Sequence, residues 1–313
     1  MTPLLYMILG LAGLWFGTEF VLKGAINIAN YYNLSQLFVG LAILAIGTDL
    51  PEMVISINAA LQNVTQGTET SGIIIGNAIG SSISQISLVL GVAGLLGYLT
   101  ITRRHLFADG AMLIGSVVLV ILLGYDGHLS RVDGIILVVV YIIYFISLFY
   151  QERIRDKISK QPKGGIRKDL IILVIGLCLV VYTSEVVVDN AVEFAEMIGL
   201  KQSLVGIILI GLGTSLPELA ISLNATRKKA NALSVGNLIG SNIFDMLMPI
   251  GVGAAISELR FEKSLTYFDL PFLLIVSSVV LYFFSRKKGL QRIEAVILIA
   301  MFAMFAALKV VGV

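Results

Sequence analysis

Long apolar stretches separated by short polar ones occupy almost the whole chain. About 20 apolar residues are needed to cross the hydrocarbon core of a bilayer as a helix. Ten stretches of about this length or longer cover approximately residues 3–29, 35–62, 71–98, 105–124, 132–150, 169–199, 203–226, 232–257, 267–285 and 290–312. The pattern predicts an all-α polytopic membrane protein with ten transmembrane helices.

Composition supports this fold class and excludes several others. The chain of 313 residues is 57% hydrophobic and 13% charged, whereas a soluble domain has about 25% charged residues. The single cysteine, Cys178, excludes an internal disulfide and a cysteine-rich metal site. His105 and His128 fall in predicted loops and form no cluster, and no basic tail suggests a nucleic-acid partner. The first span begins near Pro3 without preceding basic residues, which predicts a retained helix and not a signal peptide.

The polar segment 151–168 divides the chain into an N-terminal half, residues 1–150, and a C-terminal half, residues 169–313, with five spans each. Basic residues gather on the cytoplasmic side of membrane proteins. If the N-terminus lies outside, 16 basic residues fall on the cytoplasmic side and 5 on the other. We therefore expect a multi-pass protein of the cell membrane, with both termini outside and the segment 151–168 as a cytoplasmic linker.

The two halves repeat each other. Residues 40–58 align with 206–224 at an offset of 166, and residues 76–85 align with 236–245 at an offset of 160. The repeated regions cover about 36–98 and 202–257. Because each half has an odd number of spans, the second half enters the membrane from the opposite face. Inverted repeats of this kind are typical of secondary transporters.

The first repeated motif places charge and proline inside an apolar span. It reads Gly-Thr-Asp-Leu-Pro-Glu at 47–52 and Gly-Thr-Ser-Leu-Pro-Glu at 213–218. Proline lacks an N–H and disfavours helix in the preceding residue. We therefore expect helices 2 and 7 to unwind for a few residues, which frees carbonyls near Ala45 and Gly211. Glu52 and Glu218 follow each break directly.

The second motif, Gly-Asn-x-Ile-Gly-Ser, combines small residues with polar ones. Small residues four apart let helices approach closely. The polar side chains are Asn77, Ser81, Ser84 and Gln85 in one half and Asn237, Ser241, Asn242 and Asp245 in the other. Asn77 and Asn237 fit helix packing as well as ion ligation. Together with the first motif, the predicted site holds four carboxylates, from Asp49, Glu52, Glu218 and Asp245.

These ligands are all oxygens, which selects hard cations such as Ca²⁺ and Na⁺. Mg²⁺ gives up its water reluctantly, so a site rich in protein oxygens favours Ca²⁺. Four ionised carboxylates in the membrane would cost about 10–14 kcal/mol, comparable with the whole stability of a protein, about 5–15 kcal/mol. Cations or protons must therefore fill the site, and a site that cannot stay charged and empty favours obligatory exchange.

The paired motifs on the second, third, seventh and eighth spans closely resemble the two repeats of the cation/calcium exchanger superfamily, and the prokaryotic Na⁺/Ca²⁺ exchangers are the most similar group. The resemblance covers nearly the whole chain. It implies Ca²⁺ held by Glu52 and Glu218 with Na⁺ sites around it. It also implies roles for Thr48, Ser81, Thr214, Ser215, Ser241 and Asp245 and for the carbonyls of Ala45 and Gly211. In this superfamily the first and sixth helices slide across the core to alternate access.

Two positions depart from that pattern. Asp49 stands where these exchangers usually have serine, as Ser215 does in the second half, and Gln85 stands where asparagine or aspartate is common. Asp49 also fits a helix N-cap, and an amide such as Gln85 serves ligation or packing equally. Glu19 and Glu185, which align at the same offset of 166, fit either a cation entrance or a contact between helices.

The leading hypothesis is a Na⁺/Ca²⁺ antiporter, with Ca²⁺, Na⁺ and the bilayer as its partners and neither a cofactor nor a protein partner expected. The extra carboxylate of Asp49 keeps open a Ca²⁺/H⁺ antiporter. A cation channel is a weaker alternative, because inverted repeats around one site provide no symmetric filter. An enzyme is disfavoured, because the chain has no nucleophile–base arrangement and no His-Glu-x-x-His zinc motif.

Overall fold

The computed structural model describes residues 2–101, 103–155, 166–197, 215–287 and 289–311. Within these residues, eight helices are long and apolar enough to cross a membrane, and a bent pair of helices forms a ninth span. These nine coincide with nine of the ten predicted stretches. The seventh predicted span lies partly outside the described residues, and its described part is α12.

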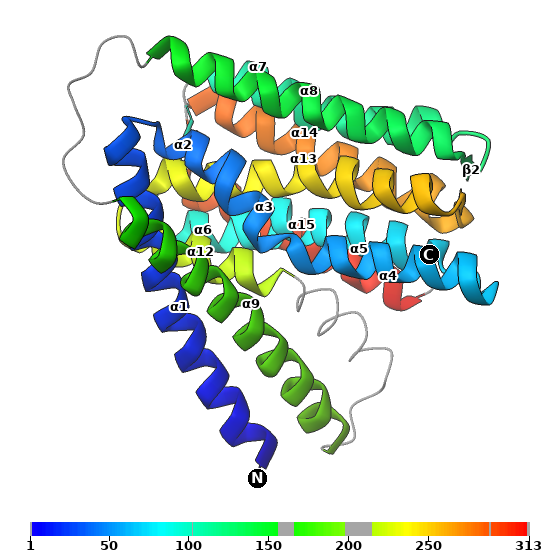
Figure 1. Cartoon of the computed structure of the whole chain (residues 1–313), viewed down its shortest axis with the longest axis horizontal. Coiled ribbons are helices and arrows are strands. Elements are labelled where there is room, and N and C mark those ends of the chain that lie inside the picture. The colour runs from blue at the N-terminus through cyan, green and yellow to red at the C-terminus, as the bar shows by residue number, and fades with distance from the viewer. Residues whose placement is uncertain (1, 102, 156–165, 198–214, 288, 312–313) are drawn as a thin grey trace.

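Within the described residues, the elements are helices, with three π-helical segments (η) and four short strands; Figure 1 shows their arrangement. Those of the first half are α1 (Thr2–Tyr32), α2 (Gln36–Val39), η1 (Gly40–Leu44), α3 (Ala45–Thr48), α4 (Leu50–Gln66), α5 (Ser71–Ile83), η2 (Ser84–Val89), α6 (Leu90–Leu96), β1 (Leu99–Thr100), α7 (Arg103–Leu123), β2 (His128–Leu129) and α8 (Arg131–Arg155). Those of the second half are α9 (Ile166–Met197), α12 (Leu216–Arg227), α13 (Asn231–Ile256), β3 (Leu259–Arg260), η5 (Leu265–Asp269), α14 (Leu270–Lys287), β4 (Gly289–Leu290) and α15 (Arg292–Val311).

The second span is broken at Asp49, where α3 and α4 meet. The bent pair Gln36–Thr48 and Leu50–Gln66 turns by 43° at this point. Pro51 sits in the first turn of α4, where its missing N–H costs no helical hydrogen bond. The predicted break is confirmed, but only Asp49 is unwound, because the turn that precedes it closes with a hydrogen bond from Asp49 N to Ala45 O at 3.0 Å. The Ala45 carbonyl thus accepts a hydrogen bond and is not freed by the break, and its role as an ion ligand stays a prediction.

The helices α1 and α9 pack along each other and project away from the remaining bundle (Figure 1). Glycines line their interface. A Cβ on Gly13 would lie 2.4 Å from the Thr183 side chain, and one on Gly176 would lie 2.6 Å from the backbone N of Val21. Asn27 Nδ2 donates to Asp169 Oδ1 at 2.8 Å near one end of the pair. Such close approach is typical of membrane helices that pack through small residues.

The helix α13 forms the centre of the remaining bundle and is buried along most of its length. Its glycines meet the broken span of the other half. A Cβ on Gly236 would lie 2.4 Å from Leu37 O, and one on Gly40 would lie 2.5 Å from Leu233 O. Any larger residue at these positions would push the two backbones apart. The second repeated motif therefore places the motif helix of one half directly against the broken helix of the other.

Two short antiparallel ribbons, which the sequence did not predict, join loops of the two halves. Leu99 of β1 pairs with Leu290 of β4, and His128 of β2 pairs with Arg260 of β3. Because α7 runs from β1 to β2 and its 21 residues rise roughly 31 Å, the ribbons lie at opposite ends of the bundle. Each ribbon takes one strand from each half.

Candidate functional site

The residues that precede α4 and α12 have the same backbone conformation. Asp49 has φ −89° and ψ 8°, and Ser215, its counterpart in the second half, has φ −90° and ψ 5°. In each case a proline follows at the start of the next helix, and Glu52 or Glu218 lies in that helix's first turn. The sequence repeat is therefore also a backbone repeat.

Four carboxylates, the predicted ones, are fully buried in this region, since Asp49, Glu52, Glu218 and Asp245 each have 0% exposure. Asp49 lies close enough to the other three for their charges to interact. No described lysine or arginine forms an ion pair with any of the four. Burial of several unpaired carboxylates is unfavourable unless cations or protons neutralise them.

A chain of hydrogen bonds joins the motifs of the two halves. Ser81 Oγ lies 3.4 Å from Glu52 Oε1 and 3.4 Å from Ser215 Oγ. Gln85 Nε2 donates to Ser81 Oγ at 2.9 Å and to Asp245 Oδ2 at 3.2 Å. Side chains separated by more than one hundred residues in the sequence thus meet at a single point between the halves.

Gln85 is held in place by a residue outside the predicted ligand set. Asn242 Nδ2 donates to Gln85 Oε1 at 3.0 Å and to Leu238 O at 2.9 Å. The first contact fixes the amide so that its NH₂ group faces Asp245 and Ser81. The only sequence signal for Asn242 was its place in the second repeated motif.

Many oxygens around this point are buried without a hydrogen bond. Within the described part of the chain, the partnerless atoms include both carboxylate oxygens of Asp49 and of Glu218, Glu52 Oε2, Asp245 Oδ1, Ser241 Oγ and both side-chain polar atoms of Asn237. Buried polar atoms of native proteins are nearly always satisfied. An unsatisfied set of carboxylate, hydroxyl and amide oxygens is the donor set that a hard cation takes.

The remaining predicted residues differ in placement. Thr48 Oγ1 lies within hydrogen-bond distance of two carbonyls of its own segment, Leu44 O at 3.1 Å and Ala45 O at 3.3 Å. Asn77 Nδ2 is buried and has no hydrogen-bond partner among the described residues. Thr214 and Gly211 lie outside the described residues. In the described ranges, no group of three or more His, Cys, Asp and Glu side chains is placed to hold a metal ion.

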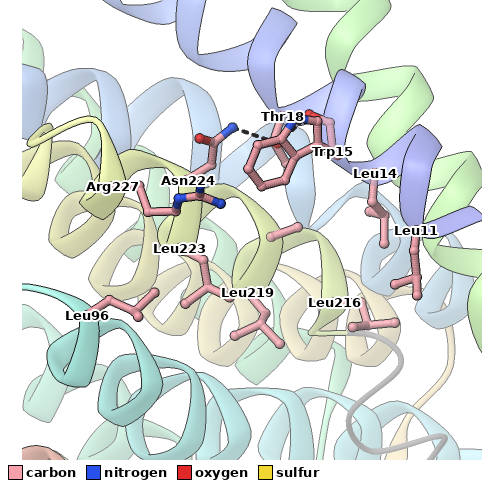
Figure 2. A pocket seen from close by; sticks show the side chains of 11 residues that line it. Leu11, Leu14, Trp15, Thr18, Leu96, Leu216, Leu219, Leu223, Asn224 and Arg227 are labelled. Carbon is pink, nitrogen blue, oxygen red and sulfur yellow. Dashed lines mark hydrogen bonds between the residues drawn. The ribbon is translucent and has the colours of Figure 1, made fainter.

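A second set of contacts, which sequence reasoning foresaw only in part, connects α1 with the end of α12 (Figure 2). Asn224 Nδ2 donates to Thr18 Oγ1 at 2.9 Å and to Glu19 Oε1 at 3.2 Å. Glu19 also forms an ion pair with Lys228. The contact between helices, one of two roles left open for Glu19, is therefore confirmed. Its counterpart Glu185 is exposed and forms no ion pair among the described residues.

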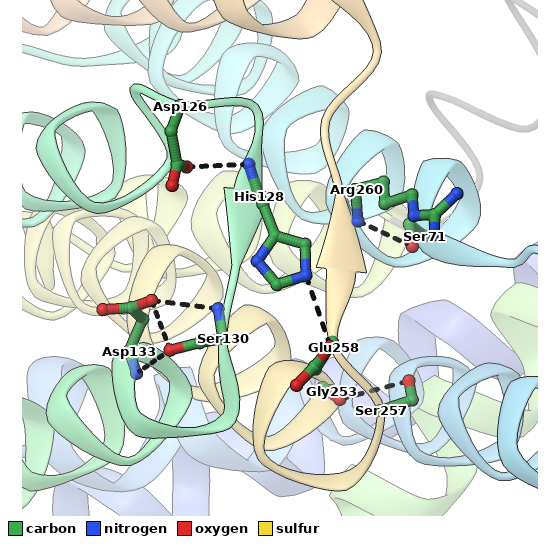
Figure 3. A network of polar contacts seen from close by, with 9 residues as sticks. All are labelled: Ser71, Asp126, His128, Ser130, Asp133, Gly253, Ser257, Glu258 and Arg260. Atoms are coloured by element: carbon green, nitrogen blue, oxygen red, sulfur yellow. Dashed lines mark hydrogen bonds and ion pairs between the residues drawn. The ribbon is translucent and has the colours of Figure 1, made fainter.

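A third polar cluster surrounds the ribbon of β2 and β3 at the opposite end of the bundle (Figure 3). His128 Nε2 lies 3.4 Å from Glu258 Oε2, and Arg260 N donates to Ser71 Oγ at 2.9 Å. A polar cavity of about 500 Å³ adjoins this cluster and is lined by both acidic and basic side chains, including Glu69 and Arg131. Because the lining carries both acidic and basic side chains, it fits a contact between loops better than a binding site for one kind of ion.

Comparison with known proteins assigns a family to this architecture. The model of the family described as sodium/calcium exchanger protein matches residues 2–150 and 168–311. The chain is 28% identical to sodium/calcium exchanger MaX1 of Methanosarcina acetivorans over 96% of both proteins. It is 32% identical to inner membrane protein YrbG of Escherichia coli, over 87% of this chain and 86% of that one. A solved structure of the sodium–calcium exchanger NCX_Mj matches with a TM-score of 0.84 at 30% identity, covering 98% of each chain.

Proposed function

The chain belongs to the sodium/calcium exchanger family, and from that premise we propose that it exchanges Na⁺ for Ca²⁺ across the cell membrane as a secondary antiporter. The family consists of membrane transporters and not of enzymes. The observation that carries the proposal is the meeting of Glu52 and Ser215, from the equivalent breaks of the two halves, through Ser81. Carboxylate and hydroxyl oxygens from both halves then surround the transported ion.

The proposed fold has ten transmembrane helices in two inverted repeats, with α12 completing a seventh, broken span. The two ribbons support the inversion. Leu99 of β1 corresponds to Leu259 of β3 at the repeat offset of 160, and each of these strands pairs with a strand of the other half. Repeats related by a two-fold axis in the membrane plane would place one ribbon at each surface. The basic loops support a cytoplasmic linker and outside termini.

The free-energy cost of an empty, ionised site explains why one ion must be exchanged for another. Buried carboxylates without basic partners would together cost about 10–14 kcal/mol if all were ionised. In the proposed cycle, Ca²⁺ leaves only as Na⁺ or protons arrive, because this penalty blocks the return of an empty site. The glycine-lined pair of α1 and α9 is the proposed moving part, and the bundle around α13 stays fixed.

Asp49 supports one alternative, a Ca²⁺/H⁺ antiporter. Both oxygens of this extra carboxylate are buried without a hydrogen-bond partner among the described residues. A proton can neutralise a carboxylate in such surroundings, as Na⁺ can. The two proposals share the site and differ only in the ion that returns.

Reconstituted vesicles test the proposal. Vesicles loaded with Na⁺ should take up ⁴⁵Ca²⁺ when diluted into Na⁺-free buffer, and Glu52→Gln should abolish this uptake. The exposed Glu258 provides a matched control, since Glu258→Gln should transport normally. Uptake that needs a pH gradient and ignores Na⁺ would establish the alternative, and uptake that needs neither gradient would exclude antiport.

A further inference from the structure

A groove separate from the carboxylates lies between α1, α6 and α12 (Figure 2). Its volume is about 470 Å³, within the range of about 300–1,000 Å³ that is typical of small-molecule sites. Most of its lining is aliphatic, with Leu14, Leu219 and Leu223 among the contributing side chains. Thr18 and Asn224, which are hydrogen-bonded to each other, are its polar side chains besides Arg227. None of the four buried carboxylates lines it.

The open side of the groove faces the surroundings of the protein. Leu11 and Trp15 of α1 and Leu96 of α6 form its rim, and their exposed fractions are 52%, 44% and 57%. These residues belong to spans long and apolar enough to cross a membrane. Apolar side chains exposed at this depth face lipid. The groove is therefore accessible to acyl chains.

The length of the groove corresponds to one leaflet of a bilayer. It follows α12 from Leu216 to Arg227. The 12 residues of α12 rise roughly 18 Å, and half of the hydrocarbon core measures about 15 Å. An acyl chain that enters at the end marked by Arg227 thus reaches the bilayer centre near Leu216.

The end of the groove at Arg227 carries positive charge. The Arg227 guanidinium lies 4.5 Å from the centre of the Trp15 ring, and Lys228 and Lys229 follow it in the sequence. Glu19 is the acidic side chain that faces this end, and its ion pair with Lys228 neutralises one of the three cations. In the described residues Arg227 has no ion-pair partner. Juxtamembrane basic residues of this kind attract anionic lipids of the cytoplasmic leaflet.

We propose that this groove binds an anionic phospholipid, with one acyl chain along α12 and the headgroup phosphate at Arg227. The groove separates α1, the proposed moving helix, from α12 of the fixed bundle, so the bound lipid occupies space that α1 crosses during exchange. This consequence for exchange rests on the proposed function, but the binding site itself does not depend on which ions are carried.

The chain contains a single tryptophan, Trp15, at the rim of the groove, which allows a direct test. The protein is reconstituted in phosphatidylcholine vesicles with a minor fraction of phosphatidylglycerol, and one lipid at a time carries bromine on its acyl chains to quench Trp15. Brominated phosphatidylglycerol should quench about fivefold more effectively per molecule than brominated phosphatidylcholine.

Two pairs of variants locate the effect. Arg227→Gln should remove the preference, whereas Arg286→Gln, at another exposed basic position, should retain it. Ala220→Phe fills the groove without a new tryptophan and should also remove the preference, unlike Ala303→Phe at an exposed position on α15. The ratio of the two quenching constants is taken within each variant, so that loss of the contact between Arg227 and Trp15 does not affect it.

Equal quenching by both lipids in the unchanged protein would overturn the proposal, as would a preference that survives Arg227→Gln or Ala220→Phe. The assay needs no ion gradient. If the protein prefers the anionic lipid but shows no Na⁺-driven ⁴⁵Ca²⁺ uptake, the lipid site stands and the proposed function is wrong. If it shows the uptake but no lipid preference, the proposed function stands and the lipid site is wrong.

Discussion

The start of α4 in the first half and the start of α12 in the second half have nearly the same backbone but different chemistry. Asp49 and Ser215 differ by a few degrees in φ and ψ, yet one side chain carries a charge and the other a hydroxyl. The helices that follow also differ, since α12 ends in basic residues where α4 has Leu61 and Gln62. The shared backbone places Glu52 and Glu218 alike, and the differing side chains give each half its own chemistry and, in the proposed cycle, its own contact with α1.

The strongest test of the symmetry is to replace Glu52 and Glu218, which lie in the first turns of α4 and α12. Glu52→Gln and Glu218→Gln should each reduce Na⁺-driven ⁴⁵Ca²⁺ uptake by at least about 30-fold, because each removes a charged, buried ligand. Equal losses would show that both halves hold the ion. If one variant transports at the normal rate, the proposed shared site is wrong.

A second test concerns the close contact of the halves. Gly236→Ala should destabilise the protein by about 1–3 kcal/mol, because its Cβ would lie 2.4 Å from Leu37 O. Thermal unfolding in detergent measures the change, and Gly115→Ala on α7, where no described atom lies within 4 Å of the added carbon, is the control. Gly76, the counterpart of Gly236 in the repeat, also has no described atom within 4 Å of an added carbon. Gly76→Ala should therefore behave like the control, and a loss of stability equal to that of Gly236→Ala would contradict the explanation by close contact.

Replacing Asp49 by serine, the residue at the equivalent position of the second half, tests the difference between the halves. Asp49→Ser gives the first half the chemistry of the second. If Asp49 binds the returning proton, ⁴⁵Ca²⁺ uptake driven by a pH gradient should fall at least about tenfold, because an ionisable group has left the membrane interior. Na⁺-driven uptake, measured in parallel, should persist. Unchanged coupling to both ions would mean that Asp49 is not an ion ligand.

The contact between Glu19 and Lys228 has no counterpart at Glu185 among the described residues. Lys228→Gln should shift the equilibrium of α1 away from the observed position by at most about fivefold, the usual limit for an exposed ion pair. Spin labels at Phe16 and Leu96 in a Cys178→Ser background report the distance between α1 and α6. Lys228→Arg should restore the original distribution, and identical distributions in all three proteins would contradict a role for this ion pair.

The smallest expected effect lies in the loops that follow the two broken spans. Each loop contains a left-handed residue, Gly67 with φ 69° and Lys229 with φ 60°, but the first loop is acidic and the second basic. Hydrogen bonds from the Ser71 hydroxyl and N–H hold the pKa of Glu69 below its usual value. Because the folded pKa is the lower one, this stabilisation is present above the unfolded pKa and is lost as pH falls through the folded pKa. The small difference in melting temperature between the unchanged protein and Glu69→Gln should therefore vanish in acid, and a difference that persists there would exclude the charge as its cause.

The apolar runs and the two prolines sufficed to predict most of the spans and the position of the first break, because span length and proline chemistry act locally. The extent of unwinding was not predictable. The hydrogen bond from Asp49 N to Ala45 O forms because η1 and α3 keep the preceding turns intact, and that depends on packing against α13. Within the site, the repeat indicated which side chains belong together. The contacts of Gln85 with both Asp245 and Asn242 follow from the relative placement of α5, η2 and α13, which no local pattern encodes.

The two ribbons have a consequence for the integrity of the protein. Since β1 pairs with β4 and β2 with β3, neither half contains a complete ribbon among its described residues, and a half on its own would leave both of its strands with unpaired edges. The smallest unit in which every described strand has a neighbour contains both halves. Separately expressed halves of the present chain should therefore find each other by the same pairing.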